Sequence, residues 1–297
     1  MAIKRSMTRP YRSGPFEPAS ASGQPGYWLE PQTLGIAPGR LNKPLNQLEL
    51  LDLWRREEQE PFSGWDFRHL NGRHWTDDPK TWSYMDHASE LLRQSKSAVD
   101  LDTGGGEQLL ELRPHWPTKL YATESYPPNV KLATERLALY GVKVFDVATT
   151  YDGLMPFADG EFDLVLNRHG SFNPAEVGRV LAPGGTFFTQ QVHARTNWDL
   201  QAVFGAKTPW PDAKPEYYVP RLESAGLTIV HVKESIGRHG FTDVGALIFY
   251  LKVIPWTVPG FSVDTHQQAL LSLHQRLEGG QPLAFEWRSY VIEARKS

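Results

Sequence analysis

The stretch AVDLDTGGGE at residues 98–107 decides the fold of this chain. It is an apolar segment that carries two acids, followed by three glycines and then by residues that can open a helix. A second acid, Glu124, closes the next apolar segment, 20 residues after Gly104. Nucleoside-binding α/β folds use an acid at this spacing to accept hydrogen bonds from the ribose hydroxyls. The pattern therefore predicts a nucleoside site at the end of the first strand of an α/β fold.

The residues around the glycines narrow the choice of nucleoside. A phosphate-binding P-loop needs a Lys directly after its last glycine, and here the next Lys is Lys119. A dinucleotide fingerprint on Gly104 and Gly106 would put Leu109 at the third glycine. Glu107 would also face the pyrophosphate with a like charge. These points favour a cofactor with ribose and adenine but no phosphate, a description that S-adenosylmethionine fits.

Three further segments follow the glycine turn in a recognisable order: residues 121–124 (YATE), 155–167 (MPFADGEFDLVLN) and 176–185 (EVGRVLAPGG). Residues 98–192 thus resemble the core of a class I S-adenosylmethionine-dependent methyltransferase. The resemblance implies a Rossmann-like seven-stranded sheet, mostly parallel with an antiparallel end strand, and helices on both faces. One departure is Asp102, which takes the place of the family's first glycine. Its carboxylate could contact the amino group of the methionyl moiety, or it could cap the turn.

The resemblance also implies roles for individual residues. Glu124 would accept from the ribose hydroxyls, the glycines would let the methionyl part approach the backbone, and Asp152 would face the adenine with Ser125 beside it. Asn167 ends the fourth strand, at the edge of the sheet where such folds bind ligands. The expected S-adenosylmethionine site comprises Asp100, Asp102, Thr103, Gly104, Gly106, Glu124, Ser125, Asp152 and Asn167.

Two residues after the same strand are candidates for catalysis. His169 has an ordinary pKa near 6.5, so it could take a proton from a phenol, amine or indole near neutral pH. A structural role, in which the ring only holds the loop, is the alternative. Arg168 could hold a substrate carboxylate through its planar guanidinium, or it could pair with a local acid.

Aromatic residues gather before the glycine turn, with Trp at positions 28, 54, 65, 75 and 82. They could pack added helices against the sheet. They could also form a lid over an aromatic or apolar substrate and exclude water from it. The residues expected to bind the substrate in the second case are Trp65, Trp75, Trp82, Tyr84 and, from the later part of the chain, Trp256.

Composition and periodicity suggest three regions. Residues 1–44 hold 7 of the 23 prolines and are expected to form a Pro-rich arm that is disordered in part. Residues 45–95 are predicted to form a helical, Trp-rich cap or lid, and residues 96–297 the S-adenosylmethionine-binding domain. Helical spacing predicts helices over 45–58, from Pro79 onward, and over 215–225, 244–254 and 263–277, with Asn197 capping a short helix. Strands are expected over 227–232 and 286–294.

Several classes of protein are disfavoured by the composition. Zero Cys removes disulfides, thiolate nucleophiles and Cys-based zinc sites, and the scattered His residues predict no metal site. No run of 18 apolar residues predicts a membrane span, and the first residues lack an export signal, so we expect a cytoplasmic protein. A net charge of −3 gives no basic excess for nucleic acid.

The predicted activity is transfer of a methyl group from S-adenosylmethionine to a small-molecule acceptor of aromatic or apolar character. An RNA base methyltransferase is an alternative, in which the aromatic residues would stack a flipped base. A non-catalytic binding subunit that keeps the fold is another, and a nicotinamide dehydrogenase is disfavoured by Leu109. The sequence leaves the oligomeric state open, a homodimer being one alternative.

Overall fold

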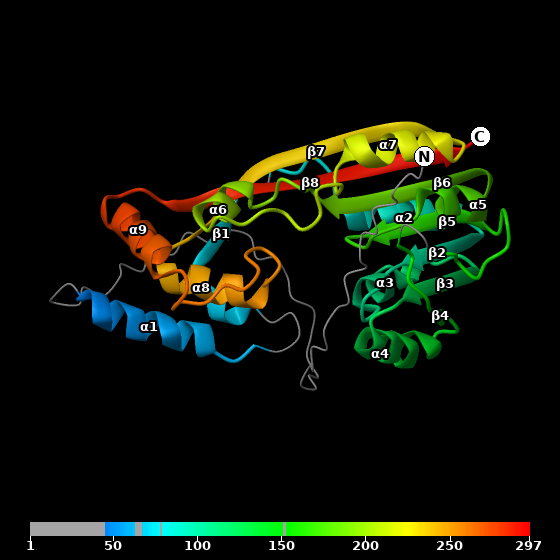
Figure 1. Ribbon diagram of the computed structural model, residues 1–297. Coiled ribbons are helices and arrows are strands. Elements are labelled where there is room, and N and C mark those ends of the chain that lie inside the picture. The colour runs from blue at the N-terminus through cyan, green and yellow to red at the C-terminus, as the bar shows by residue number, and fades with distance from the viewer. Residues whose placement is uncertain (1–44, 63–66, 78, 151–152) are drawn as a thin grey trace, which may run out of the picture.

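The computed structural model describes residues 45–297 except 63–66, 78 and 151–152. Its centre is an eight-stranded sheet in the order β1-β7-β8-β6-β5-β2-β3-β4 (Figure 1). The strands are β1 (His74–Thr76), β2 (Ser97–Leu101), β3 (Lys119–Glu124), β4 (Lys143–Asp146), β5 (Phe162–Arg168), β6 (Leu181–Val192), β7 (Leu227–Phe241) and β8 (Leu283–Lys296).

Helices connect these strands on both faces of the sheet (Figure 1). The α-helices are α1 (Gln47–Gln59), α2 (Tyr84–Gln94), α3 (Glu107–Glu111), α4 (Pro127–Ala138), α5 (Pro174–Val180), α6 (Trp198–Val203), α7 (Pro215–Ser224), α8 (Val244–Val253) and α9 (Gln267–Glu278). Two short 3-10 turns, η1 (Arg68–Leu70) and η2 (Arg113–His115), complete the described elements. The arrangement confirms the predicted α/β class with helices on both faces.

The sheet has one strand more than the seven expected. Strands β4, β3, β2, β5 and β6 are parallel, and β8 is antiparallel to both β6 and β7. The eighth strand, β1, pairs antiparallel with the last residues of β7. It can do so because β7 extends to Phe241, well past the residues 227–232 predicted from β-branched composition, and so leaves an edge free for pairing.

Local capping explains most helix starts. In α1 the side chain of Asn46 accepts from the backbone of Leu48 and Glu49, and Glu49 bonds back to Asn46, which completes a capping box. The second helix begins at Tyr84 and not near Pro79, because Ser83 supplies its cap. Asn197 precedes α6 as predicted, but its side chain does not cap that helix. It donates to Tyr250 Oη and faces His239 instead.

The molecule has a parallel part and a distal part, joined by the long strands β7 and β8 (Figure 1). Two apolar clusters cover the two faces of the parallel part, one around Phe187 and one around Phe188. A third cluster builds the distal part around α8, of which nine of ten residues are buried, packed by α1 and α9. The predicted helix 244–254 is thus confirmed, and its apolar character on all sides reflects complete burial.

The segment predicted as one helical cap contributes to both parts. Helix α1 and strand β1 belong to the distal part, whereas α2 packs on the parallel part through Tyr84, Ala88 and Leu92. The proposed three-region division stays a prediction, and the arm 1–44 lies outside the described residues. None of the described helices combines the length and the apolar character needed to cross a membrane.

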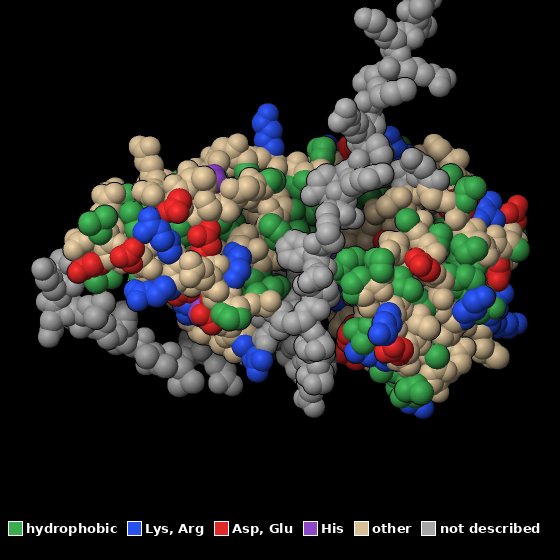
Figure 2. Space-filling model, turned by 60° about the horizontal axis from the view of Figure 1, so that its bottom comes forward, with side chains coloured by type: hydrophobic (Ala, Val, Ile, Leu, Met, Phe, Trp, Pro, Cys, Tyr) green, Lys and Arg blue, Asp and Glu red, His purple; other side chains and the backbone are tan. Residues whose placement is uncertain are grey.

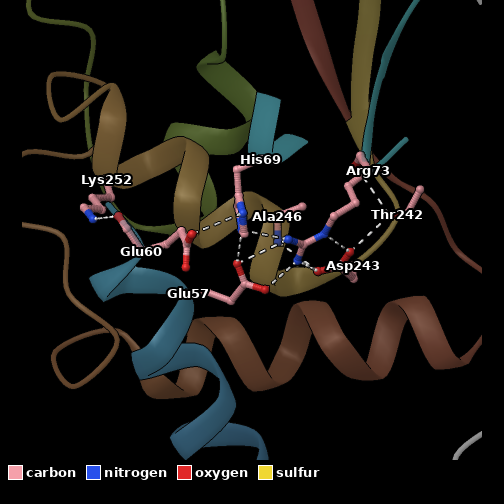
Figure 3. Close-up of polar contacts among 8 residues, drawn as sticks. All are labelled: Glu57, Glu60, His69, Arg73, Thr242, Asp243, Ala246 and Lys252. Atoms are coloured by element: carbon pink, nitrogen blue, oxygen red, sulfur yellow. Dashed lines mark hydrogen bonds and ion pairs between the residues drawn. The ribbon is translucent and has the colours of Figure 1, made fainter. Parts of the chain in front are cut away.

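A network of ion pairs fastens α1 to α8 (Figure 3). Arg73 Nη2 lies 2.8 Å from Glu57 Oε1 and 2.6 Å from Asp243 Oδ1. Asp243 also caps α8 by accepting from Ala246 N at 2.8 Å. His69 Nε2 lies 2.7 Å from the other oxygen of Glu57. We call these four residues, Glu57, His69, Arg73 and Asp243, the clamp.

Candidate active site

The glycine turn lies where β2 ends and α3 begins, at the carboxyl edge of the parallel strands. Gly104 and Gly106 have φ of 64° and 81°, values that glycine adopts without strain. A Cβ added to Gly104 would meet no atom within 4 Å, so a ligand can come close to the backbone there. At Gly106 the same Cβ would lie 3.0 Å from Leu137 Cγ of α4. Gly106 therefore serves the packing of the turn on α4, and Gly104 provides the open approach.

Asp102 adopts the backbone conformation of the glycine that it replaces. Its φ is 55°, in the left-handed region that Asp tolerates better than most residues. Its side chain lies against Gly170, where an added Cβ would be 2.5 Å from Asp102 Cβ. Oδ1 of Asp102 accepts from Thr149 Oγ1 at 3.1 Å. The missing side chain at Gly170 thus makes room for a carboxylate at the glycine position.

Glu124 ends β3 with its side chain buried, at 6% exposure. Its Oε1 accepts from the backbone N–H groups of Ser125 and Tyr126, at 2.8 and 2.9 Å. These bonds fix the direction of the carboxylate, which retains further accepting capacity because a carboxylate has about four lone-pair sites. Ser125 is exposed beside it. This is the geometry expected of a ribose acceptor.

The carboxylates around the turn act on one another. Burial raises the pKa of Asp100 to about 7, and Glu124 adds to this while Thr103 and Arg168 oppose it. Burial also raises the pKa of Asp102 to about 7, with Glu124 and Asp100 adding to the effect against the bond from Thr149. Arg168 offsets this effect only in part, so a cationic ligand would stabilise the ionised form of these carboxyl groups.

Arg168 lies behind the turn. Its Nη1 donates to Gln108 Oε1 at 2.8 Å, and its guanidinium carbon lies 5.7 Å from the ring centre of Tyr84. Within the described residues its Nε is buried without a hydrogen-bond partner. A small cavity of about 50 Å³ adjoins it, lined by Tyr84, Asp100, Asp102, Thr103, Gln108, Leu109, Leu112 and Arg168. Of the two alternatives for Arg168, this position suits a role near the local acid Asp100.

Asn167 is fully buried and its hydrogen bonds stay within the sheet. Its Nδ2 donates to Leu101 O at 3.2 Å, which ties β5 to β2. Its Oδ1 accepts from Thr189 Oγ1 at 2.9 Å and from Gln191 Nε2 at 2.6 Å. The side chain thus holds the strand ends together under the turn, whereas the sequence predicted that it would bind the cofactor.

His169 follows β5 with φ of 63°, an uncommon value for a residue with a side chain. Its backbone N donates to Gln190 O at 2.9 Å, and its Nε2 lies 3.2 Å from Gln190 Nε2. Trp82 Nε1 donates to Gln190 Oε1 at 2.9 Å. Desolvation lowers the pKa of His169, and the charges of Arg168 and Lys80 lower it further.

Of the predicted aromatic residues that the structure describes, Trp82 and Tyr84 lie near the turn and Trp75 does not. Tyr84 stacks on Phe188 with ring centres 5.1 Å apart, and Trp82 reaches the edge of the sheet near His169. Trp75 pairs with Gly240 on β7. Gln190 and Lys233 both pair with Val291 of β8, so Lys233 marks the level of the site on β7, and Gly240 lies seven residues further along that strand. At about 3.3 Å per residue this places Trp75 roughly 23 Å along the strands from the site.

Trp256 contacts another tryptophan, with its ring centre 6.0 Å from that of Trp210. Two predicted residues, Trp65 and Asp152, lie outside the described residues. The structure adds three residues that sequence reasoning missed, Gln108, Thr149 and Gln190. The paired glutamines near the carboxyl end of an apolar strand were a signal for Gln190, whereas Thr149 stands in a loop with no pattern.

A larger cleft opens beyond the end of β6, the strand next to β5. Its volume is about 760 Å³. Its lining comes from the end of β6, the N-terminus of α7 and the β7–β8 pair: His193, Ala194, Arg195, Thr208, Pro211, Lys214, Glu216, Glu234, Ile236 and Arg288. Because it lies at the same edge of the sheet as the turn, it can hold a second molecule near a bound cofactor.

Comparison with known proteins agrees with this geometry. A family model described as a methyltransferase domain matches residues 99–189, which run from β2 to β6. This core is a methyltransferase domain. A ribosomal protein L11 methyltransferase of Agrobacterium fabrum is 32% identical to the chain over 146 residues, 46% of this chain and 49% of that protein. The chain thus spans about half the length of this relative.

Two further proteins are similar to this chain. An uncharacterized methyltransferase of Synechocystis sp. is 28% identical over 159 residues, 47% of this chain and 70% of that protein. The solved structure of a candidate methyltransferase of Bacillus halodurans C-125 superposes with a TM-score of 0.51 at 18% identity. It covers 72% of this chain and 99% of that one, which shows a shared fold.

Methyltransferases in general use S-adenosylmethionine, and two features of the turn bear on the alternative of a dinucleotide. Helix α3 has only five residues, so it offers a weak dipole to a pyrophosphate. Glu107, which was expected to repel a pyrophosphate, is paired with Arg136 at 2.5 Å. The carboxyl groups that would oppose a pyrophosphate are instead Asp100, Asp102 and Glu124.

Proposed function

We propose that this protein transfers the methyl group of S-adenosylmethionine to a small-molecule acceptor. The observation that carries the proposal is the group of three acids, Asp100, Asp102 and Glu124, around a glycine turn with an open face at Gly104. A site with surplus carboxylates at the carboxyl edge of a parallel sheet suits a nucleoside with a cationic tail.

Each part of the turn has its own task in this proposal. Glu124 holds the ribose hydroxyls, and charge-assisted hydrogen bonds of this kind contribute roughly 1.5–3 kcal/mol. Asp100 and Asp102 face the methionyl ammonium, and Gly104 lets the chain of the ligand pass close to the backbone. When bound, the cofactor supplies a methyl group activated by the sulfonium charge. The protein then needs chiefly to align the acceptor, which alone can lower the barrier by roughly 7–11 kcal/mol.

The cleft beyond β6 supports a small acceptor. Its volume of about 760 Å³ falls in the usual range for sites that bind small molecules. Acidic and basic side chains are interspersed over the face shown in Figure 2, without a continuous basic stripe among the described residues on that face. An RNA substrate needs such a stripe for its phosphates. The aromatic or apolar character of the acceptor stays a prediction, because the lining combines Pro211 and Ile236 with charged residues.

Two measurements test the proposal. Calorimetry with S-adenosylmethionine should show binding, and the same titration on Glu124→Ala should show it weakened. Methyl transfer from labelled cofactor is then assayed on small-molecule extracts, on RNA and on ribosomal proteins. Label in the small-molecule fraction supports the proposal. Label in RNA alone, or binding without any transfer, would replace it by the RNA methyltransferase or the binding subunit.

A further inference from the structure

The contacts of His169 determine which of its ring nitrogens carries the proton. Trp82 Nε1 bears a hydrogen and can only donate, so Gln190 must turn its amide oxygen toward it, at 2.9 Å. The amide nitrogen of Gln190 then faces His169 Nε2 at 3.2 Å. Because an amide nitrogen is also only a donor, His169 Nε2 has to accept.

The surroundings of Gln190 leave it little freedom to turn over. The residue is buried at 5% exposure, and its backbone carbonyl accepts from His169 N at 2.9 Å. Gln190 therefore contacts both the backbone and the ring of His169. The strained φ of 63° at His169 is held by the same pairing between β5 and β6.

We propose that Trp82 and Gln190 are positioning residues that hold His169 in its Nδ1-protonated tautomer. The ring nitrogen left for a ligand is then a hydrogen-bond donor and not a base. The charged groups that act on the ring agree with a neutral imidazole. Arg168 from β5 and Lys80 from the segment before α2 are both cationic and lower its pKa, and no carboxylate among the described residues raises it. The proton position on His169 does not depend on the proposed methyl transfer; only the conclusion about the methyl acceptor rests on it.

The consequence concerns the acceptor. If His169 cannot accept a proton, the attacking atom of the acceptor must already be free of a proton that has to leave. A carboxylate meets this condition at neutral pH, whereas a phenol would still have to lose its proton, and a carboxylate oxygen can receive the Nδ1–H bond. The structure thus points to acceptors that are already nucleophilic at neutral pH.

The tautomer can be read directly by NMR on the full chain labelled with ¹⁵N in its histidine rings, with His169→Gln used to assign the signals. We expect Nε2 of His169 to be unprotonated and Nδ1 protonated from pH 6 to 9. In Gln190→Glu the carboxylate accepts from both Trp82 and His169, so the proton should move to Nε2 and the pKa of the ring should rise. Trp82→Phe should give a mixture of tautomers, while the matched control Trp75→Phe should leave the spectrum unchanged.

Calorimetry and turnover on the same samples separate the two proposals. Gln190→Glu should keep the affinity for S-adenosylmethionine within about twofold and lower turnover. A wild-type ring with Nε2–H, or one that titrates near pH 6.5, would overturn the positioning role even if methyl transfer is found. The expected tautomers in a protein without methyl transfer would overturn the proposed function and leave the positioning role standing.

Discussion

The molecule contains two polar clusters that differ in how their charges are balanced. In the clamp of the distal part, Arg73 lies between Glu57 and Asp243 and bonds to both. The glycine turn of the parallel part instead gathers Asp100, Asp102 and Glu124 near one another, with Arg168 acting on Asp100.

The pKa values follow this difference. In the clamp, burial raises the pKa of Glu57 and of Asp243, but both values are lowered because the bonds and charge of Arg73, with His69 on Glu57 and the Ala246 N–H on Asp243, together outweigh it. At the turn, burial and neighbouring carboxylates raise the pKa of Asp100 and Asp102 to about 7. A satisfied cluster stabilises the fold, whereas an unsatisfied one at the edge of a sheet is poised to bind an opposite charge.

The largest effect should come from breaking the clamp. Arg73→Ala leaves two carboxylates facing each other and removes the bonds between α1 and α8. Because Arg73 is partly exposed, we expect the free energy of unfolding to fall by about 2–3 kcal/mol, somewhat less than for a fully buried pair. Denaturant titration followed by fluorescence measures this.

Arg93→Ala is the matched control for the clamp. Its guanidinium pairs with Glu90 at 2.8 Å, but both side chains are about half exposed, at 53% and 48%. An exposed pair contributes at most about 1 kcal/mol. Equal losses in the two variants would show that the clamp is an ordinary surface network.

The next effect should appear at the ribose acid. Glu124→Ala should weaken S-adenosylmethionine binding by about 2 kcal/mol, which corresponds to roughly thirtyfold. Glu135→Ala, on the exposed side of α4, is the matched control and should bind like the wild type. Calorimetry that finds the same affinity for Glu124→Ala and the control would remove Glu124 from the site.

Cofactor binding should depend on pH because of the two raised carboxyl pKa values. Below pH 7 Asp100 and Asp102 are partly protonated, and a cationic ligand must displace protons to bind. The affinity should therefore rise by about tenfold from pH 6 to pH 8, with protons released to the buffer. Calorimetry in two buffers of different ionisation enthalpy detects that release, and a flat profile would contradict the raised values.

The smallest effect concerns stability without a ligand. The pKa of Asp102 is raised in the folded state, so its contribution to stability is present below pH 4 and is lost as the pH rises through 7. Asp102→Asn does not ionise, so it should become more stable than the wild type above pH 7, by about 1 kcal/mol given the partial exposure of the site. A constant difference from pH 4 to pH 8 would argue against a raised pKa.

The sequence predicted the parallel part better than the distal part, for a physical reason. Local sequence patterns were enough to predict the glycine turn, Glu124 and the strands after them, because each strand–turn–helix unit is contiguous in the chain. Strand β1 depends on pairing with β7, about 165 residues away, which no local pattern reveals. Helix α8 is buried on all sides, so its periodicity is flat, and only the Asp243 cap and the Leu247/Leu251 pair favoured a helix.

The same distinction applies within the site. Residue types at strand ends could be predicted, but the direction of each side chain could not. Asn167 and Arg168 follow one another in β5, yet one bonds within the sheet and the other lies behind the turn. The proton position on His169 depends on Trp82 and Gln190, which come from two other segments of the chain.

The most direct test of the surplus negative charge at the turn is parallel calorimetry of the full chain with S-adenosylmethionine and with NADH at pH 8. We predict that the sulfonium compound binds and that the dinucleotide, with its anionic pyrophosphate, does not. Binding of NADH alone, or of neither compound, would contradict the account.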